Sequence, residues 1–197
     1  ADARDRVRQE LGLDGRYPTA VSISRLAWEK DLPMLLRAWR RLLGGHPTAR
    51  LVILGEGPMR AALTDLAREL GIADAVVLAG HRTDLQVVLR SVDLMVQVSK
   101  FESGSMAYLE ALAARIPLVA TPAGMVGDDI RDAEHCLVVP HADEAGLVDA
   151  LTRIANDHAL RERLVTAGRQ AVELTFSVQA MTRGYASIYD RLLPPHR

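Results

Sequence analysis

The fold is decided by the stretch from Leu94 to Pro117, which reads LMVQVSKFESGSMAYLEALAARIP. Its first five residues form an apolar run with the length of a buried strand. Small turn residues follow at Ser103, Gly104 and Ser105, and residues 106–114 have the composition of a helix. A strand, a turn and a helix in this order place free backbone N–H groups at the carboxyl edge of a sheet, where an anionic ligand group can bind.

Two carboxylates lie in the same stretch, Glu102 in the turn and Glu110 in the helix. A carboxylate accepts two hydrogen bonds at once, which suits the vicinal hydroxyls of a sugar or ribose, and both side chains could reach one cavity. The pattern alone is equally compatible with a structural interpretation. Glu110 would then mark the solvated side of a surface helix, and Glu102 would be a charge favoured near a helix N-terminus.

Strands and helices are expected to alternate along the whole chain. The expected strands are residues 19–24, 51–54, 76–78, 94–98, 118–120 and 136–139, and the expected helices are residues 1–13, 32–43, 58–70, 84–91, 106–114, 144–154, 160–173 and 178–193. This alternation predicts a parallel sheet covered on both faces. We therefore expect one domain over residues 1–197, an α/β fold with a doubly wound, Rossmann-like six-stranded sheet in the order 3-2-1-4-5-6.

In such a sheet the crevice opens between the first and fourth strands. The loops that face it are residues 25–31 and 100–105, so topology predicts that Arg25 and Lys30 lie near Glu102. Two cations in one loop suit a departing diphosphate, whose negative charge has to be neutralised. The alternative is that both are solvated loop charges, with Lys30 paired to a neighbouring acid.

Composition narrows the possible partners. The chain has 197 residues, is 49% hydrophobic and has a formal net charge of -1, which indicates a soluble globular domain without the basic footprint of a nucleic-acid or membrane-surface protein. No apolar run approaches the roughly 18 residues that span a bilayer. The histidines lack metal-ligand spacing, so we expect no metal site. Cys136 is the only cysteine, which fits a cytoplasmic setting.

Two expected loops contain glycines directly after or close to the end of a strand. Gly55-Glu56-Gly57-Pro58 resembles the start of a dinucleotide fingerprint, but Arg60 stands where the third glycine would be, so a dehydrogenase is disfavoured. The glycines are expected to serve turn geometry. The second loop, Gly80-His81-Arg82, ends the third expected strand, and on its residues alone it is a polar surface loop.

The spacing of Glu102 and Glu110, followed by Ala-Leu-Ala-Ala-x-x-Pro-Leu-Val-Ala-Thr, resembles the nucleotide-sugar site of retaining GT-B glycosyltransferases of the group 1 and family 4 type. The resemblance extends from about Leu11 to about Leu193. It implies that Arg25 and Lys30 grip the donor diphosphate and that Glu102 orients the sugar. The remaining implied contacts are the turn from Ser103 through Gly104 and Ser105 to Met106 at the sugar or phosphate, Glu110 at the ribose, and Gly80, His81 and Arg82 at the nucleobase.

Several positions depart from the family pattern. Ser24 replaces the glycine that precedes the diphosphate-gripping arginine, Ser105 stands where a glycine is usual after a now missing phenylalanine, and Arg115 replaces another common glycine. The segment 124–128 also differs from the usual Gly-Gly-x-Pro-Glu. These substitutions indicate a divergent member with an altered sugar end of the pocket.

The resemblance covers only the C-terminal, donor-binding half of a GT-B enzyme. We therefore expect an acceptor-binding N-terminal domain outside this chain, a UDP-, GDP- or ADP-sugar donor, no cofactor, and no transfer by the isolated domain because its cleft is half built. Two alternatives stay open. One is a GT-B nucleotide-sugar epimerase, and the other is a non-catalytic nucleotide-sugar-binding module.

Overall fold

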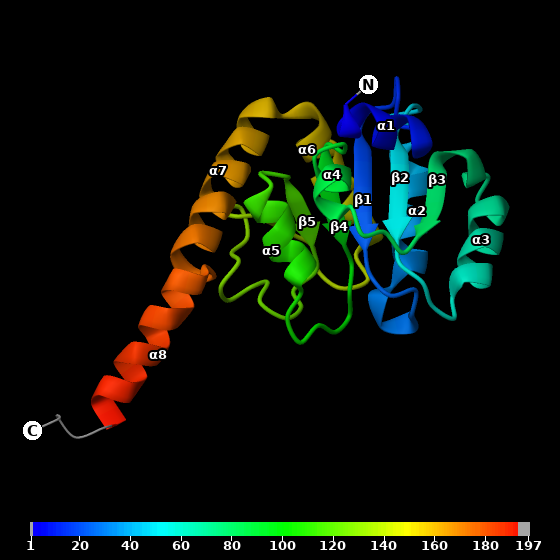
Figure 1. The fold of residues 1–197 in the computed structure, drawn as a ribbon. Coiled ribbons are helices and arrows are strands. Elements are labelled where there is room, and N and C mark those ends of the chain that lie inside the picture. Colours follow the sequence, from blue (N-terminus) through cyan, green and yellow to red (C-terminus); the bar gives the residue numbers. More distant parts are fainter. Residues whose placement is uncertain (1, 193–197) are drawn as a thin grey trace, which may run out of the picture.

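The computed structural model describes residues 2–192 and contains one six-stranded sheet in the order β3-β2-β1-β4-β5-β6. All of its neighbouring strands pair in parallel. The strands are β1 (Thr19–Ile23), β2 (Arg50–Leu54), β3 (Val76–Gly80), β4 (Leu94–Gln97), β5 (Leu118–Ala120) and β6 (Leu137–Val138). This confirms the predicted doubly wound topology, and the carboxyl ends of β1 and β2 point to the lower edge of the sheet in Figure 1.

Helices cover both faces of the sheet (Figure 1). They are α1 (Ala3–Glu10), α2 (Leu32–Leu42), α3 (Arg60–Glu69), α4 (Leu85–Leu89), α5 (Met106–Ala113), α6 (Glu144–Asn156), α7 (His158–Thr175) and α8 (Val178–Leu192), with short 3-10 turns η1 (Trp28–Lys30) and η2 (Ala73–Ala75). One face packs against α2, α3 and α6, and the other packs against α1, α4 and α5.

The two cores follow from the alternation of side chains along the strands. Ala20 and Leu51 contribute to the α2 side, whereas Val21 and Val52 contribute to the α5 side, and all four are fully buried. Successive strand residues point to opposite faces, so a strand covered on both faces is apolar at most of its positions. The largest side chain of the α2 side is Trp39, which is 0% exposed.

The sequence predicts that α3 begins at Pro58, but the helix begins at Arg60. Residues 57–59 are instead held by the loop after β1, because the Met59 amide donates to the Leu26 carbonyl at 3.0 Å. A Cβ on Gly57 would lie 2.4 Å from the same carbonyl oxygen, and a Cβ on Gly55 would lie 2.0 Å from the Ser24 carbonyl oxygen. The glycines therefore allow the β2 loop to brace the β1 loop by close backbone contact.

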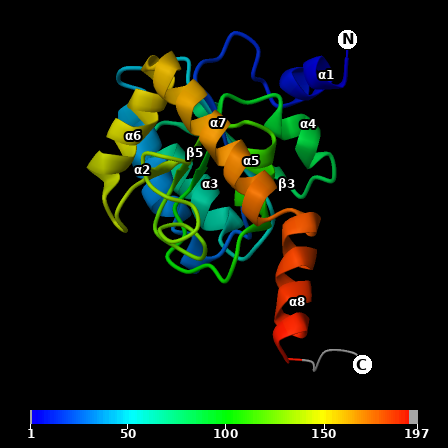
Figure 2. The same ribbon diagram turned by 90° about the vertical axis from the view of Figure 1, so that its left-hand side faces the viewer.

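The helix α8 leaves the body of the domain and projects past α7 (Figures 1 and 2). None of its residues is buried. Its exposed large apolar side chains are those of Val178, Met181, Tyr185, Ile188, Tyr189 and Leu192, and Leu174 is exposed near the end of α7. The spacing of three and four residues places the α8 side chains in one stripe along that helix, the α8 stripe.

Candidate functional site

The loops after β1 and β4 meet at the carboxyl edge of the sheet. The Lys30 ammonium lies 2.7 Å from Oε1 of Glu102, across 72 residues of sequence. The backbone amide of Lys100 donates to the Glu29 carbonyl at 2.7 Å, and the side-chain ammonium of Lys100 lies 3.5 Å from the Asp31 carboxylate. The predicted proximity of Lys30 and Glu102 is therefore present, and three separate polar contacts connect the two loops.

Glu102 is held in a defined orientation. Oε1 accepts hydrogen bonds from Lys30 Nζ and from Ser99 Oγ, the latter at 2.8 Å. Ser99 is itself fixed, because its carbonyl accepts a 2.6 Å hydrogen bond from Oγ1 of Thr121, which directly follows β5. The side chains of Lys30 and Glu102 are only 14% and 11% exposed, so this ion pair is better shielded from solvent than a surface pair.

A buried glutamine joins the two strands that carry these loops. Gln97 is 2% exposed, and its carboxamide oxygen accepts from Ser22 Oγ at 2.7 Å and from the Ile23 amide at 3.2 Å. Its amide nitrogen donates to the Ile23 carbonyl at 2.8 Å. Gln97 therefore fixes the end of β1 against the end of β4. Gln97 is not among the site residues predicted from the sequence, although a polar residue inside an otherwise apolar strand is a visible signal.

Arg25 does not contact Glu102. Its side chain is 70% exposed and pairs with Glu29 at 2.5 Å, an i,i+4 contact within the same loop. The Arg25 hydrogen bond lowers the pKa of the Glu29 carboxyl. The expectation that both cations face Glu102 therefore holds for Lys30 alone. Arg25 instead lines a neighbouring hollow.

That hollow has a volume of about 400 Å³ and lies at the carboxyl ends of β1, β2 and β3. Its lining residues are Ile23, Ser24, Arg25, Leu54, Gly55, Glu56, His81, Arg82 and Leu85. Two of the residues predicted to lie at the nucleobase, His81 and Arg82, are thus in one cavity with the predicted diphosphate ligand Arg25. The hydroxyl of Ser24 is buried here and has no hydrogen-bond partner within residues 2–192.

Arg82 acts as an anchor for the β3–α4 loop. Its guanidinium donates to Asp84 at 2.8 and 2.6 Å and to Glu10 at 3.1 Å. These acids raise the pKa of the guanidinium, and the same contact lowers the pKa of the Asp84 carboxyl. Because Nε and Nη2 of Arg82 are engaged by protein carboxylates, Arg82 shapes the wall of the hollow by ordering the loop.

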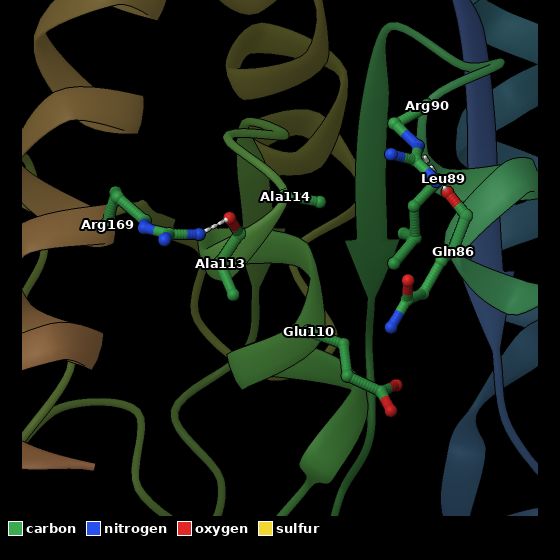
Figure 3. A pocket seen from close by; sticks show the side chains of 7 residues that line it. All are labelled: Gln86, Leu89, Arg90, Glu110, Ala113, Ala114 and Arg169. Carbon is green, nitrogen blue, oxygen red and sulfur yellow. Dashed lines mark hydrogen bonds between the residues drawn. The ribbon is translucent and has the colours of Figure 1, made fainter. Parts of the chain in front are cut away.

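Glu110 lines a different hollow, between α4 and α5, with a volume of about 270 Å³ (Figure 3). The other lining residues are Gln86, Leu89, Arg90, Ala113, Ala114 and Arg169. Figure 3 shows the carboxylate extending from α5 on the side that faces Gln86, whereas Arg169 reaches over from α7 to the Ala113 carbonyl. Glu102 is not part of this lining, so the two carboxylates do not share one cavity.

The first turn of α5 offers backbone donors next to Glu102. Ser105 is the N-cap residue, and its side chain makes no capping hydrogen bond. The first amides of a helix have no intrahelical acceptor, so those of the α5 first turn can receive an anionic group. The preceding Gly104 has φ 157, and Gly124 approaches so closely that a Cβ there would lie 3.0 Å from the Glu102 Cβ.

Metal-binding clusters and membrane-spanning helices are absent from residues 2–192. That part of the chain contains no group of three or more His, Cys, Asp or Glu side chains arranged to hold a metal ion. None of its helices combines the length and the apolar character needed to cross a bilayer.

Known proteins resemble this chain in both sequence and structure. Residues 3–171 match the family described as "Glycosyl transferases group 1". A curated relative, the lipopolysaccharide core biosynthesis glycosyltransferase LpsE of Rhizobium meliloti, is 32% identical over 181 residues, which is 92% of this chain and 52% of LpsE. The chain spans about half the length of the curated relatives it matches.

Solved structures share the fold. The Anabaena protein HepE in complex with UDP has a TM-score of 0.87 at 18% identity, over 95% of this chain and 52% of HepE. The C-terminal domain of the group 1 family protein LpcC from Francisella tularensis has a TM-score of 0.76 at 21% identity, and the match covers 90% of this chain and 95% of that domain. The architecture therefore occurs elsewhere as a structure of a C-terminal domain alone.

Proposed function

The chain belongs to the group 1 glycosyl transferases, and from this premise we propose that it binds the nucleoside-diphosphate-sugar donor of a retaining glycosyl transfer. The observation that carries this proposal is the contact between Lys30 and Glu102 at the switch point of the sheet. It places a cation for phosphate oxygens beside a carboxylate for sugar hydroxyls, in the crevice where ligands of open α/β sheets bind.

The structural neighbours support this choice of ligand. HepE has been crystallised with UDP, with UDP and glucose, and with UDP-glucose, and the Staphylococcus aureus protein TarM has been crystallised with UDP. A UDP-sugar is accordingly the first donor to test for this chain, ahead of GDP- and ADP-sugars.

The donor would have to extend over both hollows and the Lys30–Glu102 contact. The nucleobase would enter the hollow that contains His81 and Arg82, and the ribose would bind Glu110 on α5. Lys30 and Arg25 would neutralise the diphosphate, which requires each to exchange its present carboxylate partner for phosphate oxygens. The sugar would lie at Glu102 and at the turn from Ser103 to Met106.

In the transfer step, negative charge develops on the oxygen of the departing diphosphate. Lys30 and Arg25 would stabilise that charge without a metal ion, as the resemblance implies. Glu102 would orient the sugar by its hydroxyls. Positioning of the acceptor for reaction would also need a further part of the enzyme, so this chain alone would bind donor without transferring the sugar.

A thermal-shift series with UDP, GDP, ADP and their glucose conjugates tests the proposal. A ligand that binds only the native state stabilises it by about 2.7 kcal/mol at a concentration of 100 times Kd. We expect at least one nucleoside diphosphate to raise the melting temperature, with the matching nucleoside monophosphate giving a smaller shift. Equal shifts for diphosphate and monophosphate, or none at all, would contradict a diphosphate site.

A further inference from the structure

Two large aromatic side chains are exposed at the rim of the candidate site. Trp28 on η1 is 65% exposed and Phe101 after β4 is 67% exposed, and their ring centroids are 6.0 Å apart in an edge-to-face arrangement at 68°. Within residues 2–192, the exposed large apolar side chains outside α7 and α8 are those of Tyr17, Trp28, Phe101 and Met106. Outside α7 and α8, two of the three exposed aromatic rings in this part of the chain therefore lie at this edge of the domain.

The same contacts that build the site hold the aromatic pair in place. Trp28 lies two residues before Lys30 and Phe101 directly precedes Glu102, so the Lys30–Glu102 ion pair joins the segments that carry both rings. A second contact joins the residues next to the two rings, because the amide of Lys100 donates to the carbonyl of Glu29. The two rings are thus fixed relative to each other and to the carboxylate expected to orient the donor sugar.

The surroundings suit a saccharide better than an apolar protein surface. The pair is bordered by charged groups, Lys100 at 42% side-chain exposure and Asp31 at 15%, and these form an ion pair with each other at 3.5 Å. The face of an aromatic ring carries partial negative charge and attracts the polarised C–H groups on one face of a pyranose ring, while charged neighbours can bond its hydroxyls. A protein interface would instead be expected to extend as a larger continuous apolar patch.

We propose that Trp28 and Phe101 form a stacking platform for a pyranose ring of the saccharide acceptor, next to the donor sugar at Glu102. This inference rests on the proposed donor function, because that function places a donor sugar beside the platform. The shared chemistry is the apolar face of a pyranose, which an acceptor or the donor sugar itself could supply. The edge-to-face geometry leaves ring faces open to receive it.

The two tryptophans provide an internal control for the test. Trp39 is 0% exposed and Trp28 is 65% exposed, so the indole N–H signals in a ¹H–¹⁵N spectrum report one buried and one platform ring. We would titrate the chain with maltotriose and with tri-N-acetylchitotriose, using glycerol at matched concentration as the control. The expected result is a saturable shift of the Trp28 indole signal with at least one trisaccharide, while the Trp39 signal stays in place.

Variants separate stacking from general surface effects. Phe101→Ala should weaken trisaccharide binding roughly five- to tenfold, Phe101→Tyr should restore it, and Tyr17→Ala at the opposite end of β1 should leave it unchanged. No shift of the Trp28 signal with either trisaccharide would overturn the proposal, as would equal loss in the Tyr17→Ala control.

A parallel titration with UDP and with UDP-glucose keeps the two hypotheses distinguishable. If UDP binds and neither trisaccharide does, the donor function stands and the platform fails. If the Trp28 signal moves with UDP-glucose but with neither trisaccharide, the platform serves the donor sugar, and the acceptor assignment is wrong. If a trisaccharide binds while UDP does not, the donor function fails.

Discussion

Lys30 Nζ lies 2.7 Å from Glu102 Oε1, and this contact spans the switch point of the sheet. The charges of Lys30 and Glu102 neutralise each other. A ligand that separates them therefore has to offer a new hydrogen-bonding partner to each side chain. A diphosphate for Lys30 and sugar hydroxyls for Glu102 do so together. The geometry therefore favours a ligand that carries both groups over one that carries either alone.

Replacing Lys30 by Met should weaken UDP binding roughly 10- to 100-fold, because a hydrogen bond to a charged group contributes about 1.5–3 kcal/mol. Isothermal titration calorimetry measures the change. Arg68→Met removes the same charge from an exposed position on α3 and serves as the control. An equal loss of affinity in both variants would mean that net charge, and not the position of Lys30, governs binding.

Glu110 is predicted to bind the ribose diol, and this role can be isolated with a modified ligand. We expect UDP to bind wild-type protein roughly tenfold more tightly than 2′-deoxy-UDP, since one charge-assisted hydrogen bond is lost. In Glu110→Gln that preference should shrink, while Glu69→Gln on α3 should retain it. A preference that is unchanged in Glu110→Gln would assign the ribose to another group.

Gly124→Ala tests whether the 124–127 loop positions Glu102. A Cβ at Gly124, which has φ +63, would lie 3.0 Å from the Glu102 Cβ, whereas Gly71 has φ +67 and no atom within 4 Å of such a Cβ. Both alanine variants should lose about 1 kcal/mol of stability from the left-handed backbone. Only Gly124→Ala should also weaken UDP-glucose binding. Unaltered affinity in that variant would show that Glu102 tolerates the displacement.

The architecture was predictable because the buried strands are mostly apolar and the first five are separated by helices, as where Leu94–Gln97 is followed by Met106–Ala113. This pattern reflects burial on both faces, which constrains the sequence strongly. The start of α3 was predicted wrongly at Pro58, because a tertiary hydrogen bond from Met59 to Leu26 overrides the local preference of proline for a first helical turn.

The site was predictable only in part. Topology brings Lys30 to Glu102, and the structure has that contact. Topology does not fix the direction of a side chain. It therefore could not predict that Arg25 pairs with Glu29 or that Glu110 lines a hollow with Gln86. The Trp28–Phe101 contact was also not predictable from the sequence, because it joins two separate loops. A backbone hydrogen bond from Lys100 to Glu29 helps to hold these loops together.

Cys136 is expected to be chemically inert in the native protein. It is 0% exposed, and burial raises the pKa of its thiol to about 12, so the reactive thiolate is scarce at neutral pH. Because the folded pKa lies above the unfolded one, this contribution to stability is complete below about pH 8.5 and declines as the pH rises above that value. Rapid labelling by iodoacetamide at pH 8 without denaturant would contradict this assignment, and labelling in guanidinium provides the positive control.

The α8 stripe should contribute little to the stability of the domain. Tyr185→Gln is expected to change the free energy of unfolding by less than about 0.5 kcal/mol, because the side chain is 58% exposed. Leu164→Ala on α7, where the side chain is 0% exposed, should cost about 2–5 kcal/mol. Urea unfolding measures both changes. A large cost for Tyr185→Gln would place its ring in a stabilising contact in solution.

The central claim is that two loops distant in sequence form one site for a sugar nucleotide. A ¹H–¹⁵N titration with UDP-glucose tests it most directly, because every backbone amide except those of proline reports separately. We predict that the largest shifts fall in residues 25–31, 80–82 and 100–106, with α3 unaffected. Saturable shifts confined to other surfaces, or no shifts in residues 25–31 and 100–106 at saturating ligand, would contradict the account.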